Sequence, residues 1–220
     1  MNISKIIDHT LLVPNVREEA IVKCCEEAVK YGFYSVCVYP AFIKKARAVL
    51  FESHVKVSSV IGFPSGATLP RVKIYESIEA VLNGADELDI VLNIGALKSG
   101  DWKSVARELE GIIVATPEIV HKIIIETCYL DDEEKKRACE IIMKSGAEFI
   151  KTSTGFGPSG AEVKDVKLLK SIVGDKIGIK AAGGIRTLKD LVAFLDAGAT
   201  RIGTSSGVEI INELDKKSIL

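Results

Sequence analysis

Two lysines stand alone in short apolar stretches of the sequence. Lys151 follows Phe149-Ile150, and Lys180 follows Ile177-Gly178-Ile179. Burial disfavours the charged ammonium and so lowers the pKa of a lysine, which leaves a neutral amine able to attack carbonyl groups. An ordinary lysine whose amine reaches water explains the Lys151 stretch equally well on its own. The positions of the other charged residues must therefore decide between the two interpretations.

Asp89 is a third charged residue within an apolar stretch, Leu88-Asp89-Ile90-Val91. If Lys180 is charged, its field lowers the pKa of Lys151, and Asp89 can exchange protons with reacting groups through a water molecule. A nucleophilic amine beside a proton relay is typical of enzymes that form Schiff bases. The alternative is a structural Asp–Lys network, which would perturb the same pKa values. A catalytic role is favoured over a structural one if the three side chains converge on one site.

Alternating strand-like and helix-like patterns predict the elements that carry these residues. Eight strands are expected, at residues 6–10, 35–39, 57–62, 87–92, 120–126, 149–152, 177–181 and 201–204. Helices are expected at residues 14–31, 43–50, 68–83 and 162–173, and beginning near residues 101, 131, 187 and 205. Thr68 and Thr187 are the expected N-caps of two of these helices, and the acidic run 131–134 suits the positive end of a helix dipole.

A short pattern recurs where helices end and strands begin. Gly84-Ala85-Asp86, Gly146-Ala147-Glu148 and Gly198-Ala199-Thr200 are copies of it, spaced two strand–helix units apart. The repeat and the eight alternating units predict an α/β fold, a single (βα)8 TIM barrel that occupies residues 1–220 as one domain. An open doubly wound sheet is the alternative, and it is disfavoured because no G-x-G-x-x-G turn follows the first strand.

The active site of such a barrel lies at the carboxyl ends of its strands. Asp89, Lys151 and Lys180 would therefore meet at one mouth, where their grouping favours chemistry over a structural role. Further polar residues are expected there: Asp8, Thr10, Cys37, Tyr39, Asn93 and Glu126.

Two neighbouring turns predict a phosphate site at the same mouth. Gly183 and Gly184 follow the seventh strand and let backbone N–H groups approach an anion, while Ser205 and Ser206 follow the eighth strand at the start of a helix. Two ordinary tight turns are the alternative interpretation. Their position on the two strands that often bind phosphate in barrels favours a small, phosphorylated substrate.

Several of these motifs resemble the deoxyribose-phosphate aldolase family over nearly the whole chain. They are Asp8-His9-Thr10-Leu11-Leu12, Val36-Cys37-Val38-Tyr39-Pro40, Asp89 in its strand, Phe149-Ile150-Lys151-Thr152-Ser153-Thr154-Gly155 and Lys180-Ala181-Ala182-Gly183-Gly184-Ile185-Arg186. The resemblance implies reversible cleavage of 2-deoxyribose 5-phosphate to acetaldehyde and glyceraldehyde 3-phosphate, with no metal or organic cofactor. It also implies that Lys151 forms the imine, that Lys180 perturbs Lys151, and that Asp89 joins the proton relay.

The expected site therefore has two parts. The catalytic residues are Lys151, Asp89 and Lys180. The substrate- and phosphate-binding residues are Asp8, Thr10, Cys37, Thr154, Gly155, Gly183, Gly184, Ser205 and Ser206. Two alternatives stay open: a Schiff-base aldolase or transaldolase-like barrel for another sugar phosphate, and a barrel that binds sugar phosphates without turnover. The second is disfavoured because phosphate binding requires neither Lys151 nor Lys180.

Two departures from the family pattern bear on the site. Phe156 stands where some members carry a basic residue, and the chain lacks the terminal tyrosine of other members, since its last tyrosine is Tyr129. After Ser206 we expect one or two amphipathic helical turns and then a poorly ordered tail, residues 215–220. Proton transfer is therefore expected to proceed without the tail.

The composition excludes several other classes of protein. Lys and Arg number 29 against 30 Asp and Glu, so no basic field suggests a nucleic-acid partner. No apolar run is long enough for a membrane span, and the amino terminus lacks a signal-peptide pattern. Five cysteines without a C-x-x-C pair favour a cytoplasmic protein, and three scattered histidines suggest no metal site. We also expect a homo-oligomer, either a dimer or a tetramer.

Overall fold

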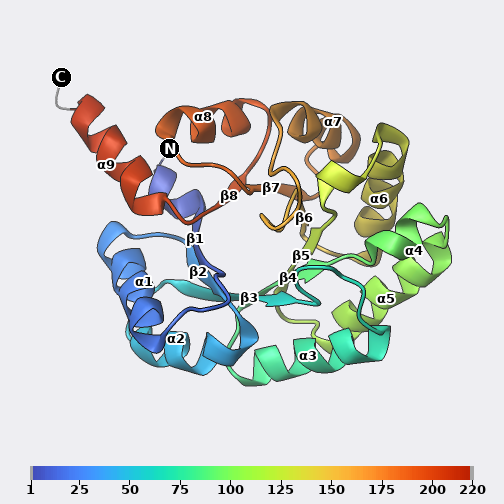
Figure 1. The fold of residues 1–220 in the computed structure, drawn as a ribbon, viewed down its shortest axis with the longest axis horizontal. Helices are drawn as coiled ribbons and strands as arrows, with labels where there is room; N and C mark the ends of the chain where they lie inside the picture. Colours follow the sequence, from blue (N-terminus) through green and yellow to red (C-terminus); the bar gives the residue numbers. More distant parts are fainter. Residues whose placement is uncertain (1, 219–220) are drawn as a thin grey trace.

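Eight parallel strands form a closed barrel in which each strand pairs with the next and β8 pairs with β1 (Figure 1). The computed structural model describes residues 2–218. The strands are β1 (Ile7–Leu11), β2 (Ser35–Val38), β3 (Lys56–Ile61), β4 (Glu87–Val91), β5 (Val120–Ile124), β6 (Phe149–Lys151), β7 (Gly178–Ala182) and β8 (Arg201–Thr204). The closed order confirms the (βα)8 prediction and excludes the open sheet.

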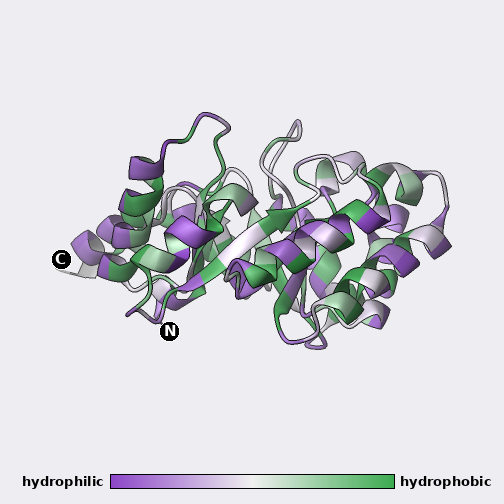
Figure 2. Cartoon of the chain, turned by 90° about the horizontal axis from the view of Figure 1, so that it is seen from below, coloured by the Kyte–Doolittle hydropathy of each residue, from purple (hydrophilic) through white to green (hydrophobic). Residues whose placement is uncertain are grey.

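The helices surround this barrel (Figure 1). They are α1 (Glu18–Tyr31), α2 (Ile43–Val49), α3 (Pro70–Leu82), α4 (Ile94–Lys98), α5 (Trp102–Ala115), α6 (Asp132–Ser145), α7 (Val163–Val173), α8 (Leu188–Asp196) and α9 (Gly207–Ser218). Short 3-10 helices occupy Ile3–Ile6, Pro40–Phe42 and Thr127–Tyr129. Viewed from below, the helices show both hydrophobic and hydrophilic residues, as expected of a layer between core and water (Figure 2).

The predicted helix starts are confirmed where a side chain caps the backbone. Thr187 and Asp190 form a capping box at α8, and Asp131 forms one with Glu134 at α6. Asp101 caps α5 by accepting a hydrogen bond from the N–H of Ser104. These caps satisfy backbone donors that would otherwise lack partners at the start of each helix.

Two predicted helix starts are wrong, and proline explains both. The first helix begins at Glu18 and not at Pro14, because residues 13–16 form a turn closed by the N–H of Val16 on the carbonyl of Val13. Leu69 and not Thr68 is the N-cap residue of α3, since a residue before proline is driven to extended backbone angles.

Two helical segments also depart from the sequence analysis. Helix α4 was not expected, and Asn93 caps it through its side chain, although Asn93 was grouped with the polar residues of the barrel mouth. Helix α9 continues to Ser218, so the expectation of a short helix is wrong, and residues 215–218 belong to the helix. The last two residues of the expected tail lie outside the described residues.

The strand register sets the positions of the charged residues. Lys151 of β6 lies directly opposite Lys180 of β7, and Asp89 of β4 lies opposite Lys122 of β5. Paired residues of parallel strands point to the same side of the sheet. The register therefore brings two lysines side by side and a third lysine beside the aspartate. No helix within residues 2–218 is long and apolar enough to cross a membrane.

Candidate active site

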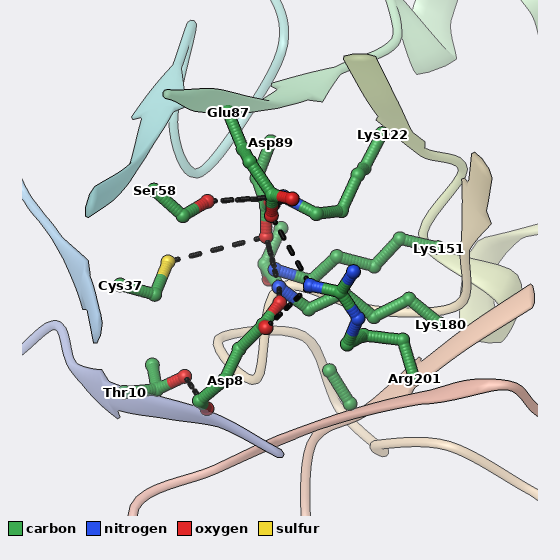
Figure 3. Close-up of polar contacts among 12 residues, drawn as sticks. Asp8, Thr10, Cys37, Ser58, Glu87, Asp89, Lys122, Lys151, Lys180 and Arg201 are labelled. Carbon is green, nitrogen blue, oxygen red and sulfur yellow. Dashed lines mark hydrogen bonds and ion pairs between the residues drawn. The ribbon is translucent and has the colours of Figure 1, made fainter. Parts of the chain in front are cut away.

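The carboxylate of Asp89 is the centre of the polar contacts inside the barrel (Figure 3). Its Oδ2 atom accepts hydrogen bonds from the amines of Lys151 and Lys180, each at 2.7 Å. Its Oδ1 atom accepts from the amine of Lys122 at 2.7 Å and from the hydroxyl of Ser58 at 3.2 Å. Asp89, Lys122 and Lys180 are fully buried and Lys151 is 2% exposed, so three lysine amines share one carboxylate away from water.

Two further carboxylates continue the network toward the amino-terminal ends of the strands. Asp8 pairs with Lys180 at 2.5 Å and with the guanidinium of Arg201 at 2.8 Å. Glu87 pairs with Lys122 at 2.7 Å and with Arg201 at 3.2 Å. We call the connected set the charge cluster; its members are Asp8, Glu87, Asp89, Lys122, Lys151, Lys180 and Arg201.

The charge cluster holds three carboxylates and four basic side chains. Unbalanced charge in a buried site is costly, so the balanced state has three cations and one neutral base. Lys151 is the basic group whose pKa is lowered, by burial and by the charge of Lys180, against the opposing effect of Asp89. The carboxylates outweigh burial and raise the pKa values of Lys122, Lys180 and Arg201. Charge balance therefore requires one neutral base, and the pKa directions favour Lys151 as that base.

Two carboxylates of the cluster, Asp8 and Asp89, are held in their ionised form. The pKa of Asp89 is well below its ordinary value, because the three lysines outweigh the opposing effect of burial. The pKa of Asp8 is also lowered, by Lys180, Arg201 and Lys122 against the effect of burial. Asp89 is thus an acceptor that orients the amine of Lys151 and draws positive charge toward it.

A cavity of about 310 Å³ opens above the charge cluster at the carboxyl ends of the strands. Of the seven cluster residues, which all lie in the described part of the chain, Lys151 alone lines it. Other lining residues are Thr10 of β1 and, from the loops after β1, β6, β7 and β8, Leu12, Thr154, Gly155, Phe156, Gly183, Gly184, Arg186 and Ser205. A small molecule in this cavity therefore meets the one amine that is free to react.

The wall of the cavity next to β7 and β8 is built from glycines. Gly183 and Gly184 have φ angles of 93° and 81°, which side-chain-bearing residues rarely adopt. A Cβ atom on Gly183 would also lie 3.0 Å from the Cα of Gly160. With Ser205 and the guanidinium of Arg186, this wall offers donors and positive charge of the kind that hold an anion.

Glu126 fixes the loop that follows β6. Its carboxylate accepts hydrogen bonds from the N–H of Thr154 at 3.2 Å and from the hydroxyl of the same residue. Glu126 is buried and has a φ of 50°, an uncommon conformation for a residue with a side chain. Phe156, two residues after Thr154 in this loop, packs edge-on against Phe63. Glu126 therefore holds in place the loop that forms this part of the cavity wall.

The expected site residues fall into two groups in the structure. Those that line the cavity are Thr10, Lys151, Thr154, Gly155, Gly183, Gly184 and Ser205. Asp8, Cys37, Asp89 and Lys180 lie beneath it as fully buried side chains, and Cys37 contacts Asp89 with its thiol at 3.9 Å. Ser206 does not line the cavity; its N–H donates to the hydroxyl of Thr204. Asp8 and Cys37, grouped with the substrate contacts, are thus placed under the cavity floor.

Four residues of the site were missed by the sequence analysis: Glu87, Lys122, Arg186 and Arg201. Lys122 is a charged residue in an apolar strand, the same signal that singled out Lys151 and Lys180. Glu87 lies two residues before Asp89 on β4 and so shares its face. Among residues 2–218, no group of three or more His, Cys, Asp or Glu side chains could hold a metal ion.

Comparisons with known proteins agree with this geometry. Residues 3–213 match the family described as DeoC/LacD family aldolase. A deoxyribose-phosphate aldolase of Caldanaerobacter subterraneus subsp. tengcongensis is 52% identical over 222 residues, which is 100% of this chain and 96% of that protein. The deoxyribose-phosphate aldolase of Thermococcus gammatolerans is 54% identical over 215 residues, with 96% of each chain covered.

Solved structures give the same result. A structure named QR15, an aldolase, is 45% identical with a TM-score of 0.95, covering 98% of this chain and 97% of that one. The tetrameric deoxyribose phosphate aldolase of Aeropyrum pernix is 35% identical with a TM-score of 0.90, covering 99% and 92%. Matches of this extent in sequence and in fold establish the family: the chain belongs to the DeoC/LacD family of aldolases.

Proposed function

We propose that this enzyme reversibly cleaves 2-deoxy-D-ribose 5-phosphate to acetaldehyde and D-glyceraldehyde 3-phosphate through a Schiff base on Lys151. The observation that carries the proposal is the position of the Lys151 amine, which lies 2.7 Å from Asp89. Lys151 is also the one member of the charge cluster that lines the cavity. The names of the similar proteins support the substrate, and the donor-rich wall of Gly183, Gly184, Ser205 and Arg186 supports its phosphate.

The reaction uses the iminium formed on Lys151 as an electron sink. The nitrogen of Lys151 adds to C1 of the open-chain sugar, and loss of water gives the iminium. The C3 hydroxyl then gives up its proton while the C2–C3 bond breaks, and the bonding electrons form an enamine on Lys151. Glyceraldehyde 3-phosphate leaves, the enamine takes a proton at C2, and water hydrolyses the resulting imine to release acetaldehyde and the free amine.

Lys180 and Asp89 support these steps by charge and position. Lys180 keeps its proton and helps to lower the pKa of Lys151, so that the neutral amine is more readily formed. Asp89, held ionised, accepts a hydrogen bond from the Lys151 nitrogen and stabilises the positive iminium. Proton exchange between Asp89 and the substrate proceeds through a water molecule in the cavity.

Arg186 supplies the positive charge for phosphate that Phe156 cannot supply. Both side chains line the cavity, and Arg186 follows the Gly183-Gly184 turn. A planar guanidinium can bind a phosphate through two hydrogen bonds. Although Phe156 replaces the basic residue of some family members, Arg186 therefore still gives the anion-binding wall a positive charge.

The proposal extends to three properties of the whole protein. We take residues 1–220 as one domain, and we infer a cytoplasmic location, which the five free cysteines support. A homo-oligomer is supported by the tetrameric aldolase of Aeropyrum pernix, to which this chain is similar. A Schiff-base aldolase for another sugar phosphate and a binding barrel without turnover are the competing proposals.

A substrate panel separates these proposals. Turnover of 2-deoxyribose 5-phosphate should exceed that of unphosphorylated deoxyribose and of other sugar phosphates. Gly184→Asp should raise KM for the phosphorylated sugar by roughly tenfold or more through repulsion, and should affect deoxyribose far less. Gly184→Asn is the matched control, because it has the same size and the same backbone constraint without the charge. Preference for another sugar phosphate, or no turnover at all, would reject the proposal.

A further inference from the structure

A second cavity, of about 380 Å³, lies beside the substrate cavity at the same end of the barrel. Its walls come from the loop after β3, from α4 and from the loops after β5 and β6: Pro64, Ser65, Ile94, Lys98, Glu126, Tyr129, Thr154, Phe156 and Gly157. Thr154 and Phe156 line both cavities, so the loop after β6 separates them. Lys151 does not line the second cavity, although its volume is in the range of small-molecule sites, roughly 300–1,000 Å³.

The carboxylate of Glu126 is buried beside this cavity without a basic partner. Glu126 is 2% exposed, and among residues 2–218 no basic side chain forms an ion pair with it. The hydroxyl of Thr154 accepts a hydrogen bond from the N–H of Phe156 at 3.0 Å and donates its own proton to Glu126. Glu126 is thus an acceptor, which is the role of an ionised carboxylate. A buried charge is costly without a partner of opposite sign, so this carboxylate favours a cation as its neighbour.

The lysine at the rim of the cavity is already matched by another acid. The amine of Lys98 lies 3.0 Å and 2.9 Å from the two carboxylate oxygens of Glu134, and it donates to the carbonyl of Tyr129 at 3.0 Å. Glu134 therefore compensates the charge of Lys98. The charge that remains uncompensated in the cavity is the negative charge of Glu126.

The remaining walls are mainly apolar and aromatic. Tyr129 is 46% exposed and Phe156 is 48% exposed, and Pro64 and Ile94 lie beside them in the lining. Aromatic faces attract cations as well as apolar groups. Gly157 lies next to the carboxylate, where a Cβ atom would be 3.2 Å from the Cδ atom of Glu126. The missing side chain of Gly157 therefore leaves room for a ligand beside that carboxylate.

We propose that the second cavity binds an organic cation, a protonated amine carried on an apolar or aromatic group. The ammonium group is bound by Glu126, and the apolar group packs on Tyr129 and Phe156. Glu126 repels sugar phosphates and other anions, which the glycine wall of the substrate cavity suits instead. A bare metal ion is a poorer fit, because Glu126 is the only carboxylate in the lining and the described residues contain no group of ligands for a metal.

A pair of matched probes tests the preference for charge. Benzylammonium and benzyl alcohol have the same ring and nearly the same size, but only benzylammonium is charged. Benzylammonium should bind the wild-type protein roughly tenfold more tightly, because a hydrogen bond to a buried carboxylate is stronger from a charged donor. Isothermal titration calorimetry gives both dissociation constants without substrate, so the result does not depend on turnover or on the proposed reaction.

Two charge variants should change the ratio of the two dissociation constants in opposite directions. Glu126→Gln keeps an oxygen that can accept from Thr154 and removes the charge, so the preference for benzylammonium should disappear. Lys98→Met leaves Glu134 at the rim without its lysine, so the preference should increase by roughly threefold or more. Glu52→Gln is the control for net charge, because Glu52 is exposed after α2 and does not line the cavity; it should leave the ratio unchanged.

A variant that fills the cavity tests the location of binding. Ile94→Trp should weaken both probes by roughly tenfold or more, whereas Ile94→Leu conserves the volume and should retain both affinities. Equal affinity of the wild type for the two probes, or a Lys98→Met variant with an unchanged ratio, would overturn the proposal. So would an Ile94→Trp variant that binds both probes as tightly as the wild type does.

Discussion

Two buried lysines of this enzyme differ in their surroundings although burial lowers the pKa of both. Lys73 of α3 is fully buried, and its amine lies 2.6 Å from Glu108 of α5 and 2.8 Å from the carbonyl of Val91. Lys151 is 2% exposed and lies 2.7 Å from Asp89. For each lysine burial is the largest cause that lowers the pKa, and a carboxylate opposes it.

The two sites differ in charge balance and in access. Lys73 has a carboxylate to itself, and its pair with Glu108 is balanced whether both groups are charged or both are neutral. Lys151 shares Asp89 with Lys122 and Lys180, so the charge cluster balances only when one base is neutral. Lys151 also lines the cavity. A lowered pKa alone therefore does not identify a nucleophile; an unmatched base that also lines the cavity is the better candidate.

Replacing each lysine by methionine should separate activity from stability. Lys151→Met should abolish turnover, by roughly a thousandfold or more, because the nucleophile is lost. It should change the free energy of unfolding by no more than about 1 kcal/mol, since the remaining three cations still match three carboxylates. Steady-state kinetics and urea unfolding measure the two effects.

Lys73→Met should show the reverse pattern. It leaves Glu108 buried without its cation, which costs about 3–5 kcal/mol of stability. Below the unfolding transition, kcat should remain within about twofold of the wild type, because Lys73 does not line the cavity. If Lys151→Met proved the less stable of the two variants, the charge-balance argument would fail.

Removing another cation of the charge cluster should move the pH dependence of activity. In Lys122→Leu and Lys180→Leu, three carboxylates face three bases, so Lys151 must be protonated to balance them. Since the pKa of Lys151 then rises, kcat/KM at pH 7 should fall about tenfold for each pH unit of the shift and recover as the pH increases. Lys122→Leu is the stronger test. Lys122 does not contact Lys151, so its loss changes the charge around Lys151 without changing its packing.

Asp8→Asn is the control of opposite sign. It removes a negative charge from the cluster, which does not favour protonation of Lys151. The pH at which activity rises should therefore not shift to higher values. Profiles of kcat/KM from pH 6 to pH 10 distinguish the cases. A loss in Lys122→Leu that is equal at every pH would show that Lys122 acts by packing and not by charge.

The smallest effect is expected from the end of the chain. A chain that ends at Leu214 loses the last turn of α9, whose described residues include no tyrosine or histidine. Activity on 2-deoxyribose 5-phosphate should remain within about twofold of the wild type, because proton transfer relies on Asp89, Lys180 and water. A large fall in kcat with unchanged KM and unchanged circular dichroism would show that the tail enters the cavity.

The sequence predicted the elements of the barrel better than the contacts between them. Periodicity and capping residues such as Thr187 act locally, so the strands and most helix starts could be predicted. Pro14 and Thr68 misled because proline suits both a turn and a helix start, and the neighbouring residues decide which one forms. The extent of α9 was missed because its last turn carries no signal stronger than its position at the chain end.

The site was predicted in part for a related reason. Lys151, Lys180 and Asp89 stood out as charges in apolar strands. Lys122 carries the same signal, but it follows His121 near the start of its strand, so the apolar stretch around it is shorter. Its contact with Asp89 depends on the register of β4 and β5, which no local pattern specifies. The charge cluster has one more basic side chain than carboxylates, and this surplus could be counted only once the contacts of Lys122 were known.

Trapping the covalent intermediate tests the central claim most directly. The wild-type enzyme is incubated with acetaldehyde and borohydride, digested, and its lysines are mapped by mass spectrometry. Reduction should leave one ethyl group on Lys151 and none on Lys73 or Lys180, because Lys151 is the free amine in the cavity. An adduct on Lys180 alone, or turnover without any trapped adduct, would contradict the assignment of Lys151 as the nucleophile.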